Sequence, residues 1–200
     1  MTMRIIAGSA RGRRLFSVPK AMMVRPISGR IKQSLFDILR PYVTGSYFLD
    51  LFAGTGAVGL EALSRGAQKV CFVERDPRCV AVIEKNLVHF GWAEQCRVLR
   101  GDVLGALSWI GHRSGITAFD VAFLGPPYRD EENRPLTYAH RTLLNLAGAG
   151  MLSAAAVVVV QHHQKEEPGS APGLERFRQE RYGDSRVTFY KKSPAPGPRP

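Results

Sequence analysis

The chain has 200 residues, 44% of them apolar, with a formal net charge of +11 and an isoelectric point near 10.1. This length suits one domain with a sizeable core. No apolar run reaches the roughly 18 residues that cross a membrane, and the N-terminus lacks the apolar segment of a signal peptide, so we expect a cytoplasmic protein with no membrane partner. The positive charge predicts a polyanionic partner, with a merely basic, soluble surface as the alternative.

Neither the cysteines nor the histidines predict a metal site or a disulfide. Cys71, Cys79 and Cys96 lack the CxxC spacing of zinc sites and are odd in number, which is typical of buried, reduced thiols in the cytosol. His162 and His163 are neighbours on an expected strand, where adjacent side chains point to opposite faces. We therefore expect no bound metal.

Residues 1–41 are predicted to form a basic extension ahead of the main domain, because Asp37 is their only acidic residue. Within it, residues 3–18 predict a hairpin, since two β-prone runs flank a turn with arginines at its tip. Such an appendage is well placed to touch a polyanionic substrate. The candidate phosphate-binding residues are Arg11, Arg13, Arg14, Arg25 and Arg30.

A helix is expected between Ser28 and Pro41. Ser28 is a suitable N-cap, and the apolar residues that follow it repeat at helical spacing. Pro41 is expected to end this helix.

A strand, a glycine-rich turn and a second helix follow at residues 48–65. The apolar residues around Asp50 are typical of a parallel strand that is buried on both faces. Gly54 and Gly56 can adopt positive φ angles and let a ligand lie against bare backbone. Gly66 is suited to end the helix. This order of elements predicts a loop that binds a nucleotide-type cofactor on an α/β sheet.

The identity of that cofactor depends on the acidic residue at the end of the strand. Gly54, Gly56 and Gly59 also match the dinucleotide fingerprint GxGxxG, but any strand–helix unit with three glycines can show it. Asp50 would repel a pyrophosphate at the helix N-terminus. S-adenosylmethionine carries an ammonium and a sulfonium, which a carboxylate attracts. A methyltransferase loop is favoured, and an NAD loop and a purely structural turn are the alternatives.

The rest of the chain alternates strands with helices, as α/β proteins do. The expected strands are 69–73, 97–99, 120–124 and 157–160, and the expected helices are 77–90, 104–110 and 136–146. Asp76 and Pro77 are suited to start the first of these helices, and Gly91 to end it. Two last strands, at 175–182 and 186–191, predict an antiparallel pair at the sheet edge. We expect the main domain to span 42–192, followed by a disordered, Pro-rich tail at 193–200.

Acidic residues stand at the ends of the first three strands, where α/β sheets bind ligands. We expect Asp50 to face the amino-acid end of the cofactor, Glu74 to accept both ribose hydroxyls and Asp102 to reach the adenine amino group. A solvated strand-end charge at Glu74 and a helix cap at Asp102 are the structural alternatives. The candidate cofactor-binding residues are Asp50, Phe52, Gly54, Gly56, Glu74, Arg75, Asp102 and Val103.

The fourth strand runs into Gly125-Pro126-Pro127-Tyr128, the candidate catalytic residues. Proline at this point leaves carbonyls free of sheet hydrogen bonds. In a methyltransferase that acts on an exocyclic base nitrogen, such acceptors hold the amine hydrogens while the nitrogen turns towards the methyl group. Tyr128 would stack on an extruded base. A rigid Pro-Pro turn is the alternative.

Several segments, among them MRIIAGSARGRRL, DLFAGTGAVGLEALSRGA, FVERDPRCVAVIEKNL and RYGDSRVTFY, are similar to the RsmD family over residues 3 to about 191. These bacterial enzymes methylate a guanine N2 in 16S rRNA with S-adenosylmethionine. The resemblance implies a class I, Rossmann-like methyltransferase sheet, mostly parallel with an antiparallel C-terminal pair and an N-terminal hairpin. It also implies the small ribosomal subunit as partner, with Asp50, Gly54, Gly56, Glu74 and Asp102 holding the cofactor and 125–128 the base. We expect a monomer.

Two positions depart from the family pattern. Gly125 replaces the usual Asp, which removes a side-chain acceptor and, by analogy with an oxyanion hole, costs about 2–4 kcal/mol in the barrier, or about 10²–10³ in rate. Gln161 stands where a Glu is expected after the fifth strand. A catalytically impaired RNA-binding relative is therefore an alternative. A DNA adenine-N6 methyltransferase is less favoured, because 200 residues leave no target-recognition domain.

Overall fold

The computed structural model describes residues 3–19, 27–130 and 132–193, so Arg25 and most of the expected tail lie outside the described residues. The strands are β1 (Tyr47–Leu51), β2 (Lys69–Glu74), β3 (Cys96–Arg100), β4 (Phe119–Leu124), β5 (Leu152–His163), β6 (Leu174–Tyr182) and β7 (Ser185–Lys192). The helices are α1 (Gly29–Val43), α2 (Ala57–Ser64), α3 (Pro77–Phe90), α4 (Ser108–Ser114) and α5 (Tyr138–Gly148), with a 3-10 turn η1 (Ala93–Gln95).

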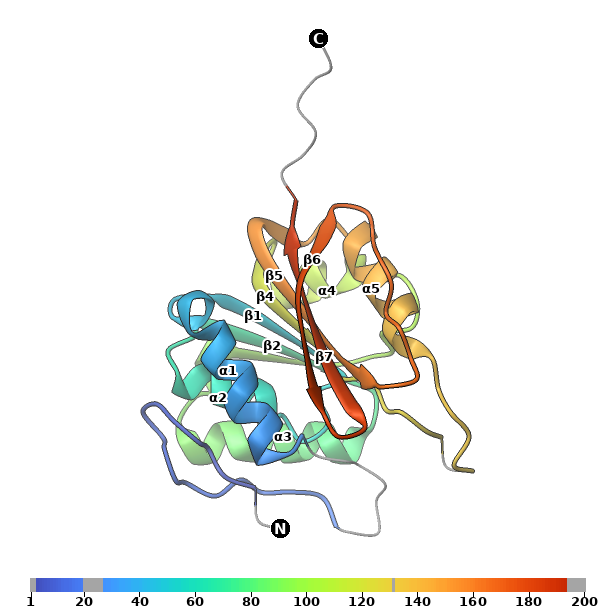
Figure 1. Cartoon of the computed structure of the whole chain (residues 1–200). Helices are drawn as coiled ribbons and strands as arrows, with labels where there is room; N and C mark the ends of the chain where they lie inside the picture. The colour runs from blue at the N-terminus through green and yellow to red at the C-terminus, as the bar shows by residue number, and fades with distance from the viewer. Residues whose placement is uncertain (1–2, 20–26, 131, 194–200) are drawn as a thin grey trace.

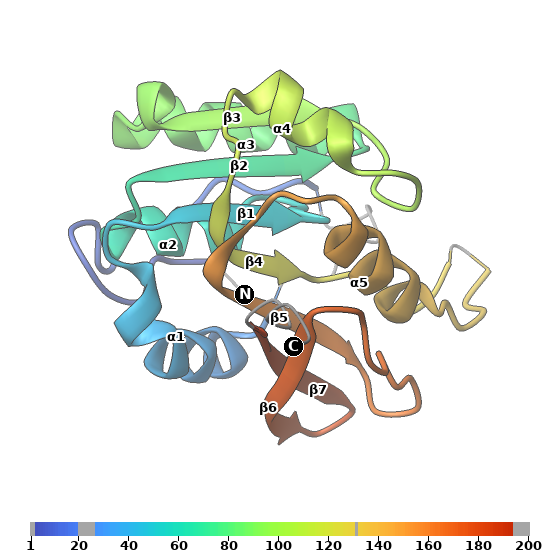
Figure 2. The same cartoon turned by 90° about the horizontal axis from the view of Figure 1, so that it is seen from above.

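All seven strands form one sheet in the order β3-β2-β1-β4-β5-β7-β6, which Figure 2 shows from one edge to the other. The strands from β3 to β5 are parallel, and β7 runs antiparallel to both of its neighbours. The expected mostly parallel sheet with an antiparallel C-terminal pair is thus confirmed. Of the helices in the described part of the chain, none is long and apolar enough to traverse a membrane.

Helices cover both faces of the sheet, because alternate strand residues point to opposite sides (Figure 1). Phe48 of β1 belongs to the apolar cluster under α1, α2 and α3. Its neighbour Leu49 belongs to the cluster under α4 and α5. Both side chains are fully buried. The middle residues of the central strands are therefore apolar on both faces, and the polar side chains of these strands lie near the strand ends.

The ends of α1 and α3 follow local sequence signals at three positions and depart from them at one. Ser28 Oγ accepts a hydrogen bond from Ile31 N over 3.2 Å, and Asp76 caps α3, which Gly91 ends at φ 74°. The expected end at Pro41 is wrong, because α1 continues to Val43. Pro41 lies in the last turn, where it removes one helical hydrogen bond, and the two further residues let Val43 pack into the core at 2% exposure.

Two elements begin more than two residues from the expected position. β5 begins at Leu152, five residues before the predicted start, because Leu152 pairs with Phe119 ahead of an irregularity in the β4–β5 register. α4 begins at Ser108, because the residues after Asp102 first form a turn in which Leu104 N donates to the Asp102 carboxylate.

The N-terminal segment lies along α2 and α3 (dark blue in Figure 1) and turns as expected, but without two regular strands. Its arms pair through an antiparallel bridge between Arg4 and Arg14. The N–H groups of Ile6 and Ala7 donate instead to the Glu61 carboxylate of α2, at 2.8 and 3.0 Å. These contacts to α2 add to the backbone hydrogen bonds between the two arms, in which Ile5 N donates to Arg13 O and Leu15 N donates to Met3 O, both over 3.0 Å.

Candidate active site at the carboxyl edge of the sheet

The loop between β1 and α2 holds three left-handed residues in close succession. Phe52, Gly54 and Gly56 have φ angles of 58°, 54° and 79°. A bulky residue such as Phe52 rarely adopts this conformation, and backbone strain of this kind, about 1–3 kcal/mol, concentrates at functional sites. The tight turn presents its backbone at the carboxyl edge, as expected for a cofactor loop.

Gly59 explains how α2 can pack so closely on the sheet. A Cβ atom at this position would lie 2.2 Å from the ring of Phe72 in β2. Only a residue without a side chain fits there, so this glycine serves helix–strand packing rather than ligand contact.

Asp50 is buried beneath this loop, with 1% exposure. One carboxylate oxygen accepts a hydrogen bond from Gly59 N over 2.9 Å. Burial raises the pKa of Asp50 to about 8, the nearby charge of Glu74 raises the pKa further, and the Gly59 hydrogen bond opposes the shift. Asp50 therefore ties β1 to the first turn of α2, and a cation placed beside it would favour its ionised form.

Glu74 joins two loops at the end of β2. Its Oε2 atom accepts from Gly54 N over 2.8 Å, and its Oε1 atom accepts from Arg75 N and Asp76 N over 2.8 and 2.9 Å. A carboxylate offers about four acceptor positions, so one remains for a further donor. The structure thus places an oriented acceptor directly beside the glycine-rich loop.

The other predicted cofactor residues lie near the end of β3 or beside Glu74. Asp102 is exposed, and its Oδ1 atom accepts from Leu104 N over 2.8 Å, so it caps its own turn rather than a helix. Val103 is buried in the cluster under α4 and α5, and Arg75 is exposed.

The loop after β4 meets the end of β1. Gly125 N donates to Leu51 O over 3.3 Å. Gly125 does not have a positive φ, so its backbone conformation does not demand glycine; a Cβ atom there would lie 2.8 Å from the buried ring of Phe123.

Tyr128 is held at its hydroxyl by the ends of two other strands. Gln161 Nε2 of β5 donates to Tyr128 Oη over 2.9 Å, and Tyr128 Oη donates to Ser185 Oγ of β7 over 3.1 Å. The ring also lies edge-on to His163, with centroids 5.8 Å apart. Sequence reasoning identified Gln161 only as a departure from the family pattern and missed Ser185, which no local signal marks.

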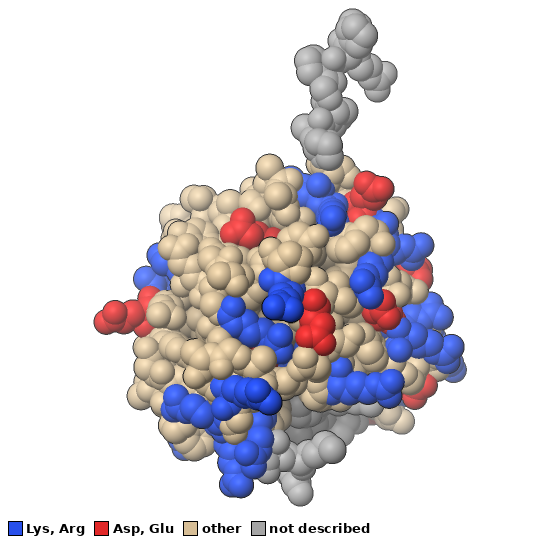
Figure 3. Space-filling view, turned by 60° about the vertical axis from the view of Figure 1, so that its left-hand side comes forward, with Lys and Arg blue, Asp and Glu red and all other residues tan. Residues whose placement is uncertain are grey.

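The predicted phosphate contacts within the described residues are exposed: Arg11, Arg13, Arg14 and Arg30. Arg13 is partly committed to the protein, since it donates to His89 O over 2.9 Å and lies 4.3 Å from the centre of the Phe90 ring. In the lower part of the face shown in Figure 3, Lys and Arg side chains predominate over Asp and Glu. This face offers positive charge to a polyanion.

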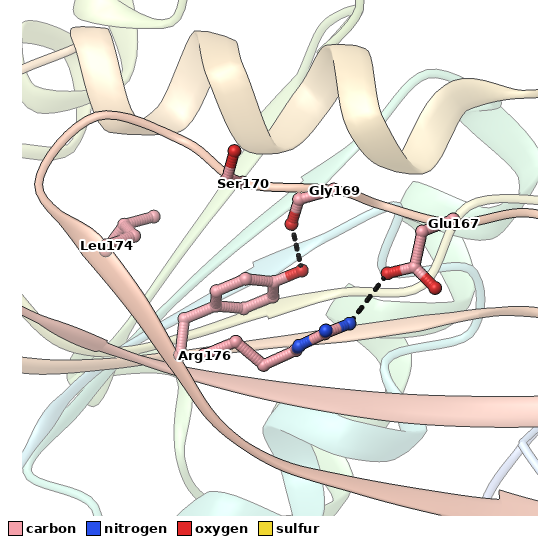
Figure 4. A pocket seen from close by; sticks show the side chains of 6 residues that line it. Glu167, Gly169, Ser170, Leu174 and Arg176 are labelled. Carbon is pink, nitrogen blue, oxygen red and sulfur yellow. Dashed lines mark hydrogen bonds and ion pairs between the residues drawn. The ribbon is translucent and has the colours of Figure 1, made fainter.

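A separate pocket lies on the α5 side of β6 and β7, away from the carboxyl edge (Figure 4). Its polar groups satisfy each other: Arg176 pairs with Glu167 at 2.9 Å, and Tyr190 Oη donates to Gly169 O at 2.7 Å. Among the described residues there is no group of three or more His, Cys, Asp and Glu side chains arranged to hold a metal ion.

A seven-stranded sheet of this order, with a glycine-rich loop after β1 and a strand-end carboxylate on β2, defines a class I S-adenosylmethionine-dependent methyltransferase. The family described as "Conserved hypothetical protein 95" matches residues 3–191, and the chain belongs to this family, the RsmD family that its sequence resembles.

Relatives and solved structures agree with this assignment. The chain is 36% identical over 190 residues to "Putative rRNA methyltransferase YlbH" of Bacillus subtilis, covering 95% of this chain and 99% of the relative. It is 41% identical over 126 residues to "Ribosomal RNA small subunit methyltransferase D" of Haemophilus influenzae, covering 62% and 63%. The structure "Putative methyltransferase yhhF from Escherichia coli" superposes with a TM-score of 0.78 at 28% identity, covering 97% and 99%.

Proposed function

We propose that the chain transfers a methyl group from S-adenosylmethionine to the exocyclic N2 of a guanine in 16S rRNA. The observation that carries the proposal is the contact between two loops at one sheet edge. The glycine-rich loop follows β1, the Pro-Pro-Tyr loop follows the neighbouring β4, and Gly125 N donates to Leu51 O where they meet. The cofactor loop and the Pro-Pro-Tyr loop are thereby adjacent.

The residues around the first loop fit S-adenosylmethionine. We assign Glu74 to the ribose hydroxyls, because its carboxylate is fixed beside Gly54 and keeps an acceptor position. We assign Asp50 to the cationic amino-acid end and Asp102 to the adenine amino group. Phe52, Gly56, Arg75 and Val103 complete the set. When bound, the cofactor supplies a methyl group activated by its sulfonium.

The residues of the second loop would hold the base. The Pro126 carbonyl accepts one hydrogen of the substrate amine, and the ring of Tyr128 stacks on the extruded guanine, a contact worth about 1–3 kcal/mol. The amine is neutral when it attacks and loses its proton to water afterwards, so no general base is required before transfer. Gly125 lacks a side-chain acceptor, which is the observation that favours the impaired RNA-binding relative as a second candidate.

The names of the relatives and the basic surface support an rRNA substrate. We assign phosphate contacts to Arg11, Arg13, Arg14 and Arg30, together with Arg25, which lies outside the described residues. The partner is then the small ribosomal subunit in the cytoplasm, and the chain acts on it as a monomer.

The product nucleoside tests this assignment. The chain is incubated with S-adenosylmethionine and small ribosomal subunits from a strain lacking the modification, with large subunits and tRNA as controls. Mass spectrometry of the digested RNA should detect N2-methylguanosine from the small-subunit rRNA alone. Methyladenosine, or methylation confined to the control RNAs, would contradict the proposal.

A further inference from the structure

The proposed reaction needs two hydrogen-bond acceptors at the substrate amine, and this inference rests on that reaction. An exocyclic amine carries two hydrogens, and its lone pair is delocalised into the ring until both are held out of the ring plane. The Pro126 carbonyl accounts for one acceptor. Gly125 has no side chain to supply the other. A second acceptor supplied by the protein must therefore come from a neighbouring element.

The sheet register puts Gln161 beside Gly125. Leu124 of β4 pairs with Val160 of β5, so the next residue along each strand direction, Gly125 and Gln161, is also adjacent. Neighbouring strands lie about 4.8 Å apart. A side chain on β5 at this position is therefore close to the place where a side chain at residue 125 would begin.

Gln161 also faces the same side of the sheet as a side chain at 125 would. Val159, two residues before Gln161, and Val187, its partner on β7, belong to the cluster under α1, α2 and α3. A Cβ built on Gly125 meets the ring of Phe123, which belongs to the same cluster. Alternation along the strands thus brings both positions to one face.

The amide of Gln161 is already oriented. Its Nε2 atom donates to Tyr128 Oη over 2.9 Å, and that hydroxyl is anchored in turn on Ser185. With the nitrogen engaged, the amide oxygen has no hydrogen-bond partner among the residues that the structure describes. Tyr128 is the residue assigned to stack on the base, and its hydroxyl holds the nitrogen end of the Gln161 amide.

We propose that the amide oxygen of Gln161 accepts the second hydrogen of the substrate amine and so replaces the acceptor that Gly125 lacks. With both hydrogens held, the nitrogen lone pair forms the new bond to the methyl carbon. The methyl–sulfur bond breaks, its electron pair stays on sulfur, and one amine proton leaves to water. A neutral amide suffices, because it accepts a hydrogen bond and takes no proton.

The test is a double-mutant cycle on methyl transfer to small subunits. Gln161→Met keeps the length of the side chain and removes the acceptor, and we expect it to lower kcat about 10²-fold. Gln161→Glu retains an acceptor and should stay within about tenfold of the parent. Gly125→Asp combined with Gln161→Met should recover most of the loss, because the new carboxylate supplies the acceptor. Gly125→Ala is the control: it adds a Cβ atom against Phe123 without an acceptor, so its kcat shows how much the crowding alone lowers the rate.

Tyr128→Phe separates direct contact from positioning, since it removes the Gln161–Tyr128 hydrogen bond and keeps the ring. If Gln161 acted only by holding Tyr128, then Tyr128→Phe and Gln161→Met would lower kcat equally and Gly125→Asp would rescue neither. That result, or an unchanged kcat for Gln161→Met, overturns the inference. Activity in Gly125→Asp but not in the parent also overturns it. If both are inactive although calorimetry shows S-adenosylmethionine binding, the proposed function fails and the inference fails with it.

Discussion

The carboxylate of Glu74 accepts a hydrogen bond from the backbone N–H of Gly54 over 2.8 Å. This contact joins the end of β2 to the glycine-rich loop after β1, and the second oxygen of Glu74 holds the start of the loop that leads to α3. One carboxylate thus shapes both loops that border the proposed cofactor site. Its loss should affect cofactor binding more than any exposed acidic residue nearby.

Glu74→Gln should weaken S-adenosylmethionine binding about 10–100-fold. In the variant, an NH₂ group replaces one of the oxygens that now accept hydrogen bonds from backbone N–H groups, so donor would face donor. Hydrogen bonds to charged groups contribute about 1.5–3 kcal/mol. Titration calorimetry measures the dissociation constant. Asp102→Asn is the matched control: it keeps an acceptor for its own turn and should change the affinity less. Equal losses in the two variants would refute the central place of Glu74.

Asp50 should make the free protein less stable as pH rises from about 4 to about 8. Its pKa in the folded state is about 8, above the roughly 3.9 of an unfolded Asp, so in this window the folded chain keeps a proton that the unfolded chain has released. The free energy of unfolding should fall by about 1.4 kcal/mol per pH unit relative to Asp50→Asn, as measured by urea unfolding. A pH-independent difference would show that Asp50 is ionised throughout.

The same carboxyl group offers a test of its assigned ligand. A cation bound beside Asp50 lowers its pKa, so S-adenosylmethionine should release a proton when it binds at pH 7. Calorimetry in buffers of different ionisation enthalpy detects that proton. Asp50→Asn should abolish the release, and an equal release from this variant would assign the proton to another group.

Glu61→Gln should destabilise the fold by about 3–5 kcal/mol, because it leaves the buried Lys32 and the partly buried Arg65 without their counter-charge. Glu61 is fully buried and pairs with Lys32 at 3.0 Å and Arg65 at 2.9 Å, besides holding the N-terminal segment. Urea unfolding measures the loss, and limited proteolysis should cut the N-terminal segment earlier than in the parent. The exposed Glu84→Gln is the control and should change stability by less than about 0.5 kcal/mol.

The double variant Arg11→Gln/Arg14→Gln should bind rRNA more weakly. The plot of the logarithm of the binding constant against the logarithm of the salt concentration should become less steep by about 1–2, because each substitution removes one phosphate contact. Both side chains are exposed on the N-terminal hairpin. Filter binding across a salt series measures the effect. Arg141→Gln on α5 removes an exposed charge from the other side of the sheet and should leave the slope unchanged. An equal effect in the control would indicate that only net charge matters.

Sequence patterns predicted the elements whose ends depend on local chemistry. Ser28 and Asp76 cap helices as expected because each bonds a backbone N–H two or three residues away. The end of α1 was not predictable from Pro41, because the burial of Val43 in the core outweighs one lost hydrogen bond. The early start of β5 likewise depends on pairing with β4, which is remote in sequence.

The sequence predicted which site residues lie at strand ends, but not which hydrogen bonds hold them there. Glu74 lies next to the glycine-rich loop as its position after a strand implied, yet its hydrogen bonds to two loops depend on their folded path. The anchoring of Tyr128 by Gln161 and Ser185 joins the loop after β4 to β5 and β7, which are remote from it in sequence, so no local sequence pattern could predict it. Sequence reasoning also missed the ion pairs of Glu61. An acidic residue on an otherwise apolar helix was a signal that could have indicated them.

The most direct test is transfer of a radiolabelled methyl group from S-adenosylmethionine to small ribosomal subunits that lack the modification. The chain as written should label 16S rRNA, with a rate that Gly125→Asp changes by less than about tenfold, because Gln161 and the Pro126 carbonyl hold the amine. No label in the 16S rRNA, from a chain that binds both S-adenosylmethionine and the subunit, would contradict the account and identify the chain as an RNA-binding relative that has lost its chemistry.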